Sequence, residues 1–391
     1  MITYYINFDG RDCTVFESQI FTLLSKLKDK NCNVKLINFE KNNTYEKNSI
    51  SEKFDTLIIN KIKKGSFFEP FYLSLYVSKL GKILNDEIDS NIILHCRGHF
   101  SSYIALKAKE KIVNKNIKVI SDFRGMAIDE YTEVYKEKGC IYKVFFKSLI
   151  NKIKSIERYT AVKSDYIYCV TNKLKKYLTD NYKIDSKIID VIPTCVEMKQ
   201  KAKNVDKVEE LKDKFVVVYS GGAQIWQCPD KIMETFLEIK KKKENAFLLI
   251  LSKNITEFEF FANKHGLASK DYKIISCKFN EVDGFLKQAD VGLLLRENTR
   301  INNVASPTKF AEYMINNIPV ILSHNIGDLD DFIKEYRVGF YPDDIDDIDE
   351  KLKNIDKSHC KDIITNLYLW DNYIDRMINN NIQLVSIRNR S

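Results

Sequence analysis

The segment from residue 304 to residue 321 carries side chains whose types and spacing suit the binding of an anion. It reads VASPTKFAEYMINNIPVI. Ser306 is a good helix N-cap and Pro307 suits the first helical position, which places Thr308 and Lys309 in the first turn. A helix N-terminus offers unpaired N–H groups and a partial positive charge, so a phosphate can bind there. Because a lysine opposes the helix dipole at this end, its presence favours an anion held between the two.

Glu312 follows one helical turn later, on the same face as Lys309. A carboxylate in this position could accept hydrogen bonds from ribose hydroxyls. The segment therefore suggests a site for a nucleoside diphosphate. A structural alternative explains the same residues as a capped core helix with a Lys309–Glu312 pair on its surface, and local features leave both interpretations open.

Two glycine-containing turns follow apolar runs. Gly221 and Gly222 come after residues 215–219 and would let the backbone approach a ligand closely, unless they only form a tight strand-to-helix turn. The pair matches neither G-x-G-x-x-G nor a P-loop, so a dinucleotide or ATP fingerprint is not supported. Gly10 and Arg11 follow the first apolar run and could face a sugar phosphate, with a simple turn as the alternative.

Further polar side chains stand where two other apolar runs end. His95 and His99 flank Arg97, but no acidic or cysteine partner set supports a metal site there. His99 lies beyond the expected strand end, within reach of a ligand. Asp122 and Arg124 end the next run. Either could act as a general base or an anion contact, and a buried ion pair between them is the structural alternative.

The elements that position these residues alternate between short apolar runs and helix-like stretches. This rhythm predicts βαβ units and doubly wound parallel sheets. The expected strands are 2–8, 34–39, 56–59, 92–96, 117–122, 166–170 and 188–192, then 215–219, 247–251, 272–276, 291–295 and 319–323.

A charged stretch at 198–214 interrupts the rhythm. We therefore expect one domain over residues 1–195 and a second over 196–361. A C-terminal helix, about 362–391, is expected to pack back on the first domain. Two such domains facing one another would form a cleft at the carboxyl ends of their strands, where these sheets bind ligands.

The overall charge is asymmetric. The 391 residues carry a net charge of +8, divided as +10 over residues 1–195 and −2 over 196–391. A basic first half favours an anionic partner, either nucleic acid, a phospholipid surface or a phosphate-bearing substrate. Lysine enrichment from an AT-rich genome is the alternative.

The cysteine content and the hydropathy of the sequence indicate the cellular compartment. Nine cysteines without a CxxC pair favour reduced thiols in a cytoplasm. The start shows no signal-peptide pattern, and no apolar run approaches the ~18 residues of a membrane span. Residues 141–154 form a basic amphipathic stretch that could lie on an anionic bilayer, or could be a core helix with a solvated lysine face.

The motif at 306–321 resembles the nucleotide-sugar signature of family 4 glycosyltransferases, which have the two-domain GT-B fold. Residues 215–222 resemble the first strand and glycine turn of the family's donor domain, and 285–295 its helix–strand step before the donor site. Residues 121–125 with Asp129-Glu130 resemble a D-x-R-G…D-E segment found in part of the family. The resemblance runs over most of the chain and is most specific in 285–321.

This resemblance implies an α/β protein of GT-B type, with two doubly wound Rossmann-like domains facing across a cleft. The first domain would bind the acceptor and the second the nucleotide-sugar donor. The implied reaction moves a sugar, with retention, from a UDP- or GDP-type donor to a glycan or polyprenyl-diphosphate-linked glycan. It needs no metal and no cofactor, and it would serve bacterial surface polysaccharide assembly at the inner face of the cell membrane.

The resemblance and the local chemistry together give an expected site. Arg296, Lys309 and Asp122 are the catalytic candidates, and His99 and Arg124 lie on the acceptor side. The donor-binding candidates are Gly10, Arg11, Gly221, Gly222, Lys278, Ser306, Pro307, Thr308 and Glu312.

The chain departs from the family pattern at three places. Val304 stands where a second glutamate is common, Asn317 replaces a glycine, and residues 223–227 replace the usual arginine and lysine after the glycine turn. The diphosphate is therefore expected to contact Arg296, Lys309 and helix amides.

Two rival functions are open at this point. A nucleotide-sugar epimerase of the same fold would need acid and base carboxylates around the sugar, and none can be assigned. A non-catalytic nucleic-acid or membrane-binding protein would use the basic first half and its aromatic residues, but it leaves the helix-start Lys309 and Glu312 unexplained.

Overall fold

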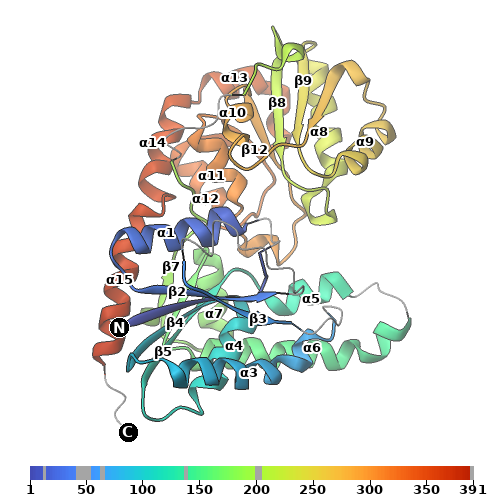
Figure 1. The fold of residues 1–391 in the computed structure, drawn as a ribbon. Coiled ribbons are helices and arrows are strands. Elements are labelled where there is room, and N and C mark those ends of the chain that lie inside the picture. Colours follow the sequence, from blue (N-terminus) through green and yellow to red (C-terminus); the bar gives the residue numbers. More distant parts are fainter. Residues whose placement is uncertain (12–14, 41–53, 62–66, 136–139, 199–204, 388–391) are drawn as a thin grey trace. The chain divides into compact units, whose positions relative to one another are not determined.

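The computed structural model describes residues 1–11, 15–40, 54–61, 67–135, 140–198 and 205–387. The chain divides into two compact units (Figure 1). Unit 1 comprises Met1–Pro193 together with Trp370–Ser391, and unit 2 comprises Thr194–Leu369. Each unit has its own sheet and its own core, and each is described separately below.

Unit 1 is built on a seven-stranded sheet in the order β3-β2-β1-β4-β5-β6-β7. Every pairing in it is parallel. The strands are β1 (Ile2–Asn7), β2 (Val34–Glu40), β3 (Thr56–Asn60), β4 (Asn91–Arg97), β5 (Asn116–Phe123), β6 (Tyr166–Cys169) and β7 (Ile189–Val191). Most of their residues are buried, because helices cover both faces of a parallel sheet. The seven strands expected in the first half of the sequence are confirmed.

The helices of unit 1 lie between these strands. They are α1 (Thr22–Asp29), α3 (Glu69–Asp86), α4 (Gly98–Lys109), α5 (Ala127–Tyr135), α6 (Cys140–Lys163), α7 (Asn172–Tyr182) and α15 (Asp371–Ser386). A short π-helical turn, Phe16–Phe21, precedes α1. The last helix, α15, comes from the end of the chain, and its first turn is tied to α1 by an ion pair of 2.9 Å between Lys26 and Asp371.

Unit 2 repeats this plan with a six-stranded sheet in the order β10-β9-β8-β11-β12-β13. Its pairings are also parallel. The strands are β8 (Phe215–Ser220), β9 (Ala246–Leu251), β10 (Tyr272–Ile275), β11 (Val291–Leu294), β12 (Val320–Leu322) and β13 (Gly339–Phe340). The helices are α8 (Pro229–Lys242), α9 (Ile255–Lys264), α10 (Val282–Leu286), α11 (Thr308–Ile315), α12 (Leu329–Tyr336), α13 (Ile348–Lys353) and α14 (Lys357–Leu367). The two-residue strand β13 is too short to give a sequence pattern and was not expected.

The C-terminal helical stretch differs from the sequence prediction. Instead of one helix over the segment beginning near residue 362, there are two: α14 in unit 2 and α15 in unit 1. The break falls at Leu369, which forms a parallel bridge with Val196. The N–H of Val196 also donates to the carbonyl oxygen of Tyr368, at 2.8 Å. Extended pairing at this point ends the helix.

The strand orders of the two sheets correspond, and in each the order reverses between the first and fourth strands. In unit 1 this point lies between β1 and β4, and in unit 2 between β8 and β11. Doubly wound sheets bind ligands at the carboxyl ends of the strands beside such a point. The predicted α/β fold class is confirmed, and both switch points hold residues expected to do chemistry.

The basic stretch at 141–154 forms part of α6. Leu149 and Ile153 are fully buried, in a cluster with residues of the loop before α3 and of α5. The described apolar face of this stretch thus contributes to the core of unit 1, while Lys147 and Lys154 are exposed and Phe145 is 51% exposed. The side chains of residues 141–144 lie outside the described part. None of the described helices combines the length and apolar character needed to cross a bilayer.

Candidate active site

In unit 2, the start of α11 differs by one residue from the sequence prediction. The helix begins at Thr308, and Pro307 is its N-cap in extended conformation, with φ −69° and ψ 124°. Ser306 does not cap the helix, because its hydroxyl oxygen accepts a hydrogen bond of 3.0 Å from the N–H of Thr194. Thr308 and Lys309 still lie in the first turn, as expected.

Lys309 is a buried cation. The residue is only 9% exposed. Its Nζ donates hydrogen bonds to the hydroxyl of Tyr219, at 2.9 Å, and to Oε1 of Gln227. The ammonium also lies 4.2 Å from the centre of the Tyr219 ring. Burial lowers the pKa of Lys309 well below its ordinary value, and the charge of Arg296 acts in the same direction. The alternative placed Lys309 on the surface in a pair with Glu312. This placement is wrong, because the Lys309 side chain points into the protein at the end of β8.

Gly221 creates the space that Lys309 occupies. Its φ is +149°, and a Cβ atom added there would lie 2.6 Å from Nζ and 2.8 Å from Cε of Lys309. The neighbouring Gly222 is also tightly packed, since an added Cβ would lie 2.2 Å from Oε1 of Gln224. Its carbonyl oxygen accepts from the Tyr219 hydroxyl at 2.7 Å. The glycine pair therefore brings the lysine close to the backbone of this turn.

Arg296 follows β11 and contacts the same loop as Lys309. Its Nη1 donates to the carbonyl oxygen of Trp226 at 2.8 Å, and its backbone N–H donates to the Ser323 hydroxyl at 3.0 Å. In the described part of the chain its Nε is buried without a hydrogen-bond partner. Burial lowers the pKa of Arg296. Two cations thus converge on the turn 225–227, within the segment that replaces the family's usual basic residues.

The other expected donor-site residues divide into two groups. Thr308 and Glu312 are half-buried on α11, and the charge of Glu312 partly opposes the lowering of the Lys309 pKa. Lys278 is exposed beyond the edge strand β10, where its backbone N–H donates to Oε2 of Glu281. Among the described residues Lys278 forms no direct contact with Lys309, so the structure groups the α11 residues and leaves Lys278 apart.

Tyr313 is a site residue that sequence reasoning missed. It is fully buried on α11, and its hydroxyl accepts from the N–H of Ser220 at 2.8 Å and donates to the carbonyl oxygen of Leu293 at 3.3 Å. A Cβ at Gly292 would lie 2.5 Å from the Tyr313 ring. Tyr313 therefore fixes α11 to the ends of β8 and β11, which keeps Lys309 in place. The signal available in the sequence was the small Gly292 in an otherwise apolar strand.

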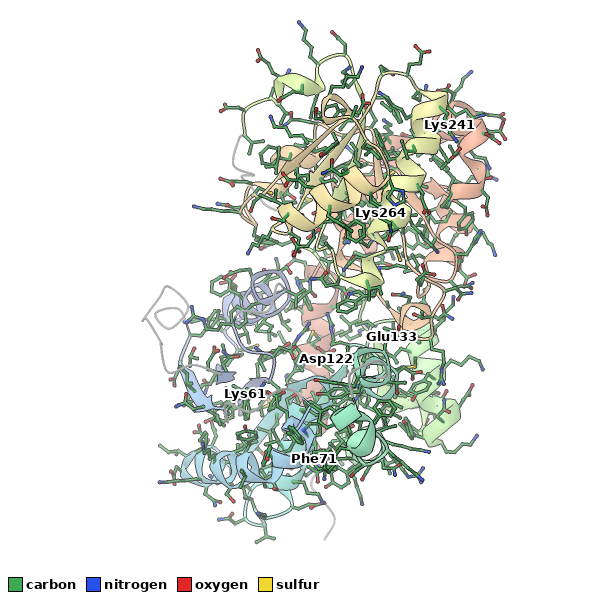
Figure 2. All side chains as sticks on the ribbon, turned by 90° about the vertical axis from the view of Figure 1, so that its right-hand side faces the viewer. Lys61, Phe71, Asp122, Glu133, Lys241 and Lys264 are labelled. Carbon is green, nitrogen blue, oxygen red and sulfur yellow. The ribbon has the colours of Figure 1, made fainter. Side chains whose placement is uncertain are left out.

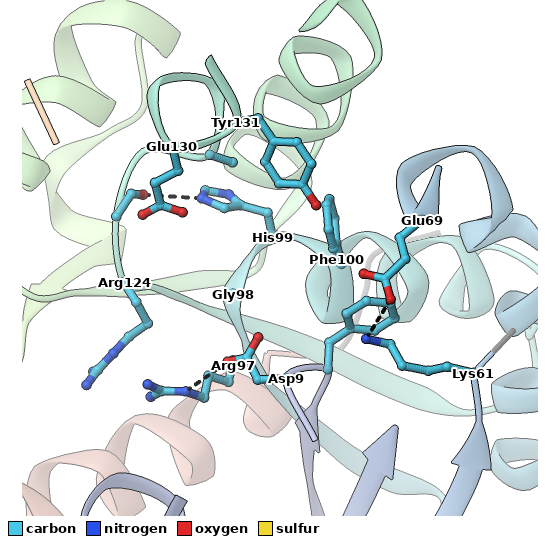
Figure 3. Close-up of a pocket in the computed structure, with 13 residues that line it drawn as sticks. Asp9, Lys61, Glu69, Arg97, Gly98, His99, Phe100, Arg124, Glu130 and Tyr131 are labelled. Carbon is cyan, nitrogen blue, oxygen red and sulfur yellow. Dashed lines mark hydrogen bonds and ion pairs between the residues drawn. The ribbon is translucent and has the colours of Figure 1, made fainter. Parts of the chain in front are cut away.

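Unit 1 has an open cavity of about 310 Å³ at the carboxyl ends of β1, β4 and β5 (Figure 3). Its lining combines charged, aromatic and backbone groups. The lining residues are Phe8, Asp9, Lys61, Glu69, Arg97, Gly98, His99, Phe100, Arg124, Gly125, Ala127, Glu130 and Tyr131. Of the residues expected in this unit, His99 and Arg124 line the cavity, whereas Gly10, Arg11 and Asp122 do not.

Gly10 belongs to a tight turn after β1. Its φ is +83°, and its carbonyl oxygen accepts from Nδ2 of Asn7 at 3.1 Å. An added Cβ would lie 3.3 Å from the Phe39 carbonyl oxygen. The adjacent Arg11 is half-buried. These contacts favour the structural alternative for Gly10, a simple turn that directs Asp9 toward the cavity.

Asp122, labelled in Figure 2, is a buried carboxylate that forms an ion pair with Arg124. Its Oδ1 lies 3.4 Å from Nη1 of Arg124, and Oδ2 lies 3.9 Å from Nε2 of His95. Burial alone would raise the pKa of Asp122, but the charges of Arg124 and Arg97, together with the neighbouring His95 ring, outweigh it and hold the pKa below its ordinary value. A carboxylate with a lowered pKa is a weak base at neutral pH, so the geometry suits Asp122 for positioning Arg124.

His99 and Gly125 form one wall of the cavity. Nε2 of His99 lies 3.2 Å from the carbonyl oxygen of Gly125. Because a carbonyl only accepts, the proton of the neutral ring is on Nε2. Burial lowers the pKa of His99, and its Nδ1 is buried without a hydrogen-bond partner in the described part of the chain. The ring is therefore neutral at pH 7.

Glu130 on α5 is the second residue that sequence reasoning missed as a site residue. Desolvation raises the pKa of Glu130 to about 7, and the negative charges of Glu157 and Asp9 add to the effect. More than a third of the residue remains exposed, which we attribute to water reaching the carboxyl through the cavity opening. An added Cβ at Gly125 would lie 2.1 Å from Oε1 of Glu130. The carboxyl is thus held against the backbone at the end of β5.

A buried carboxylate, Glu157, holds the start of α5 that carries Glu130. Its Oε2 accepts from the N–H of Ile128 at 3.2 Å, and its Oε1 accepts from the hydroxyls of Tyr177 and Tyr182 at 2.6 Å each. These three donors offset the cost of burying the charge. Glu157 thus fixes the cavity wall from α6.

Replacing Glu130 by glutamine is expected to change stability in a pH-dependent way. A raised pKa means that the folded state of the wild type holds the Glu130 proton more tightly than the unfolded state does. The protonated carboxyl therefore contributes its full stabilisation of the fold below pH 4.5, and this contribution is lost as pH rises through about 7 and the carboxyl ionises. Glu130→Gln should therefore be more stable than wild type at pH 8 by about 1 kcal/mol after solvent screening, and unchanged near pH 4.5. Thermal unfolding at both pH values measures this. An equal effect at the two pH values would contradict it.

In the part of the chain that the structure describes, no group of three or more His, Cys, Asp or Glu side chains has an arrangement that could hold a metal ion.

Comparison with protein families identifies the class of the chain. The family model described as Glycosyltransferase Family 4 matches residues 16–200, and the model described as Glucosyltransferase 3-like, C-terminal domain, matches residues 240–378. A search of curated proteins gave no match to the sequence.

Solved structures with the same fold cover nearly the whole chain. A glycosyltransferase from Rickettsia africae is 14% identical, with 99% of each chain covered and a TM-score of 0.65. The lipopolysaccharide outer core galactosyltransferase WaaB is 16% identical, with 98% of this chain and 99% of that one covered and a TM-score of 0.67. HepE from Anabaena, solved with UDP, is 8% identical, with 98% and 100% covered and a TM-score of 0.65. At these identities the structures establish the fold.

The two glycosyltransferase models lie in order along most of the sequence, one ending near the first crossing between the units and the other covering most of unit 2. Both sheets of this chain have a doubly wound, Rossmann-like strand order, and the chain as a whole has the fold of the solved enzymes. The chain is a glycosyltransferase of GT-B type that resembles family 4.

Proposed function

We propose that this glycosyltransferase moves a sugar, with retention, from a UDP- or GDP-type donor to a glycan or polyprenyl-diphosphate-linked glycan of bacterial surface polysaccharide assembly. The observation that carries the donor part is the buried ammonium of Lys309 at the first turn of α11, beside Arg296. A buried cation is costly unless a ligand uses it, and strongly shifted lysines gather at functional sites.

In this proposal unit 2 binds the donor. Lys309, Arg296 and the N–H groups at the start of α11 would surround the diphosphate, and they would stabilise the negative charge that develops when the sugar leaves. The hydrogen bonds that Lys309 now makes to Tyr219 and Gln227 would be partly replaced by phosphate oxygens. Glu312 would accept hydrogen bonds from the ribose hydroxyls.

The donor and acceptor classes rest on the comparisons. HepE was solved with UDP and with UDP-glucose, and WaaB is named as a galactosyltransferase of the lipopolysaccharide outer core. By analogy, the cavity of unit 1, with His99 and Arg124, would bind the acceptor. The proton of the acceptor hydroxyl would pass to the departing phosphate, so that neither a dedicated base nor a metal ion or other cofactor is required.

We also propose that unit 1 contacts an anionic membrane through the exposed side of α6. Phe145, Lys147 and Lys154 are exposed there, and lysines near an anionic surface contribute about 1 kcal/mol each. Lys147→Gln with Lys154→Gln should weaken binding to phosphatidylglycerol-containing vesicles about tenfold or more. Unchanged sedimentation with the vesicles would remove this part of the proposal, and Lys241→Gln in unit 2 is the control.

The experiment that tests the proposed function is a thermal-shift panel of nucleotides. UDP or GDP, at about 100 times its dissociation constant, should stabilise the protein by about 2.7 kcal/mol, and should do so equally in EDTA. The matching nucleoside, which lacks the phosphates, should not. If no nucleoside diphosphate or nucleotide sugar shifts the melting temperature, the donor assignment is wrong.

Two further measurements separate the rival functions. An epimerase would interconvert nucleotide sugars without an acceptor, which nuclear magnetic resonance of the donor mixture would reveal. A nucleic-acid-binding protein would show affinity that falls steeply with salt and would not distinguish UDP from GDP. Neither behaviour is expected.

A further inference from the structure

The charged side chains that line the unit 1 cavity are arranged in pairs. Nζ of Lys61 lies 3.1 Å from Oε1 of Glu69, and Nε of Arg97 lies 3.6 Å from Oδ2 of Asp9. Figure 3 marks both pairs with dashed lines among the residues that line the cavity. Lys61 also lies 3.8 Å from the centre of the Phe8 ring. Each of these cations therefore already has a carboxylate and an environment that stabilises it.

Arg124, the third cation of the lining, is also paired. It bonds to Asp122, as described above, and its Nη2 donates to Oε1 of Gln19 at 3.0 Å. In Figure 3 its guanidinium extends away from Glu130. His99 adds no charge, because its ring is neutral. Among the described lining residues, then, every cation is matched by an acid.

Glu130 is the exception to this pairing. No ion pair or side-chain hydrogen bond is recorded for its carboxyl group among the described residues, and the group faces the cavity beside His99 (Figure 3). The charged groups that act on it are all acidic: Asp9 after β1, Asp129 on its own helix, and Glu157 on α6. The carboxyl is thus an acceptor of hydrogen bonds in a region of negative potential.

Three aromatic side chains, Phe8, Phe100 and Tyr131, also line the cavity. Phe100 packs edge-on against Phe8, with ring centres 5.4 Å apart, and against Tyr131, with ring centres 5.7 Å apart. An apolar aromatic surface next to carboxylate acceptors fits a sugar ring, which has C–H groups on its faces and hydroxyl donors on its edge. A cavity of about 310 Å³ is large enough for one such ring.

We propose that this cavity binds one sugar residue of the acceptor, that this residue carries no acidic group, and that it donates hydrogen bonds from a hydroxyl or amino group to Glu130. This inference rests on the proposed function and narrows its acceptor class. A uronic acid or a phosphate would bring a second anion next to Glu130 without an unpaired cation to receive it. Burying an unpaired charge in this way is strongly unfavourable.

The test compares three methyl glycosides that differ only at C6: the glucoside with its hydroxymethyl group, the 6-amino-6-deoxyglucoside with an ammonium, and the glucuronide with a carboxylate. The galacto series is measured in parallel. Binding to the full chain is followed at pH 8, where Glu130 is mostly ionised, by saturation-transfer difference nuclear magnetic resonance. The variants are Glu130→Gln and, as a matched control, Glu133→Gln one turn later on α5, an exposed position outside the lining (Figure 2).

The expected order of affinity in at least one series is amino sugar, then neutral sugar, then uronic acid. Glu130→Gln should weaken the amino sugar about tenfold, the usual effect of losing a charge-assisted hydrogen bond, and should reduce the discrimination against the uronic acid. Glu133→Gln should behave as wild type. A uronic acid that binds most tightly, equal effects of the two variants, or no binding in either series would each overturn the inference.

A failure of this acceptor inference can be distinguished from a failure of the proposed function. The nucleotide panel reports on unit 2 and does not involve the unit 1 cavity. If a nucleoside diphosphate stabilises the protein but the sugars show the wrong order, only the acceptor inference fails. If no nucleotide binds, the proposed function fails regardless of the sugar results.

Discussion

Replacing Lys309 by methionine is expected to slow sugar transfer strongly and, in the protein without ligand, to raise the melting temperature. The ammonium is buried, and burial lowers its pKa well below the ordinary value, so the site costs stability until an anion arrives. Methionine has a similar length and no charge. Its substitution should stabilise the free protein by about 1–3 kcal/mol while it lowers kcat/KM by about 100- to 1000-fold.

Lys309→Met leaves few groups without a hydrogen-bond partner. The expected gain in stability can therefore be attributed to removal of the buried charge. The Tyr219 hydroxyl keeps its bond to the Gly222 carbonyl oxygen, at 2.7 Å. Lys241→Met makes the same chemical change at an exposed position that pairs with Glu238 (Figure 2), and should alter neither activity nor stability appreciably. Transfer at the wild-type rate in Lys309→Met would show that the donor phosphates bind elsewhere. A lower melting temperature would show that the buried ammonium is net stabilising.

Gly221→Ala is expected to weaken nucleotide binding at least thirtyfold, about 2 kcal/mol. The added Cβ would lie 2.6 Å from Nζ of Lys309, closer than such atoms approach, so the lysine must leave its present position. The backbone at φ +149° also disfavours a side chain, which costs further stability, about 1 kcal/mol. Calorimetric titration with the nucleotide that the wild type prefers measures the first effect.

Gly266→Ala separates the displacement of the lysine from backbone strain. Gly266 has a φ of +70°, and an added Cβ there meets no atom within 4 Å. This variant should lose stability like Gly221→Ala but keep its nucleotide affinity. Equal loss of affinity in both variants would mean that strain in unit 2, and not the position of Lys309, explains the result.

Much of the fold follows from the sequence because parallel strands are apolar on both faces and have helices between them. Of the thirteen strands in the part of the chain that the structure describes, twelve were expected near their observed places, and the two-residue β13 was missed. The position of Lys309 in the first turn of α11 was also predicted. Its burial was not, because this depends on Tyr219 and Gly221, which lie about ninety residues earlier on β8 and the turn after it.

The residues that line the unit 1 cavity were predicted from the sequence only in part. His99 and Arg124 were expected near a ligand because they follow strand ends, and both line the cavity. Asp122 was expected as a catalytic group, with a buried ion pair to Arg124 as the alternative. Nη1 of Arg124 and Nε2 of His95 lie 3.4 Å and 3.9 Å from its carboxylate oxygens, and this arrangement favours the alternative. Glu130 belongs to the D-x-R-G…D-E segment of the sequence, but only the three-dimensional arrangement shows that the charged groups acting on it are all acidic.

The central claim is that the start of α11 holds the diphosphate of an activated sugar through Lys309. Titration calorimetry of the preferred nucleoside diphosphate against wild type, Lys309→Met and Lys241→Met tests it most directly. We expect the dissociation constant to rise at least 100-fold in Lys309→Met, about 2.7 kcal/mol, and to change less than twofold in Lys241→Met. Equal affinity of the wild type and Lys309→Met would contradict the claim.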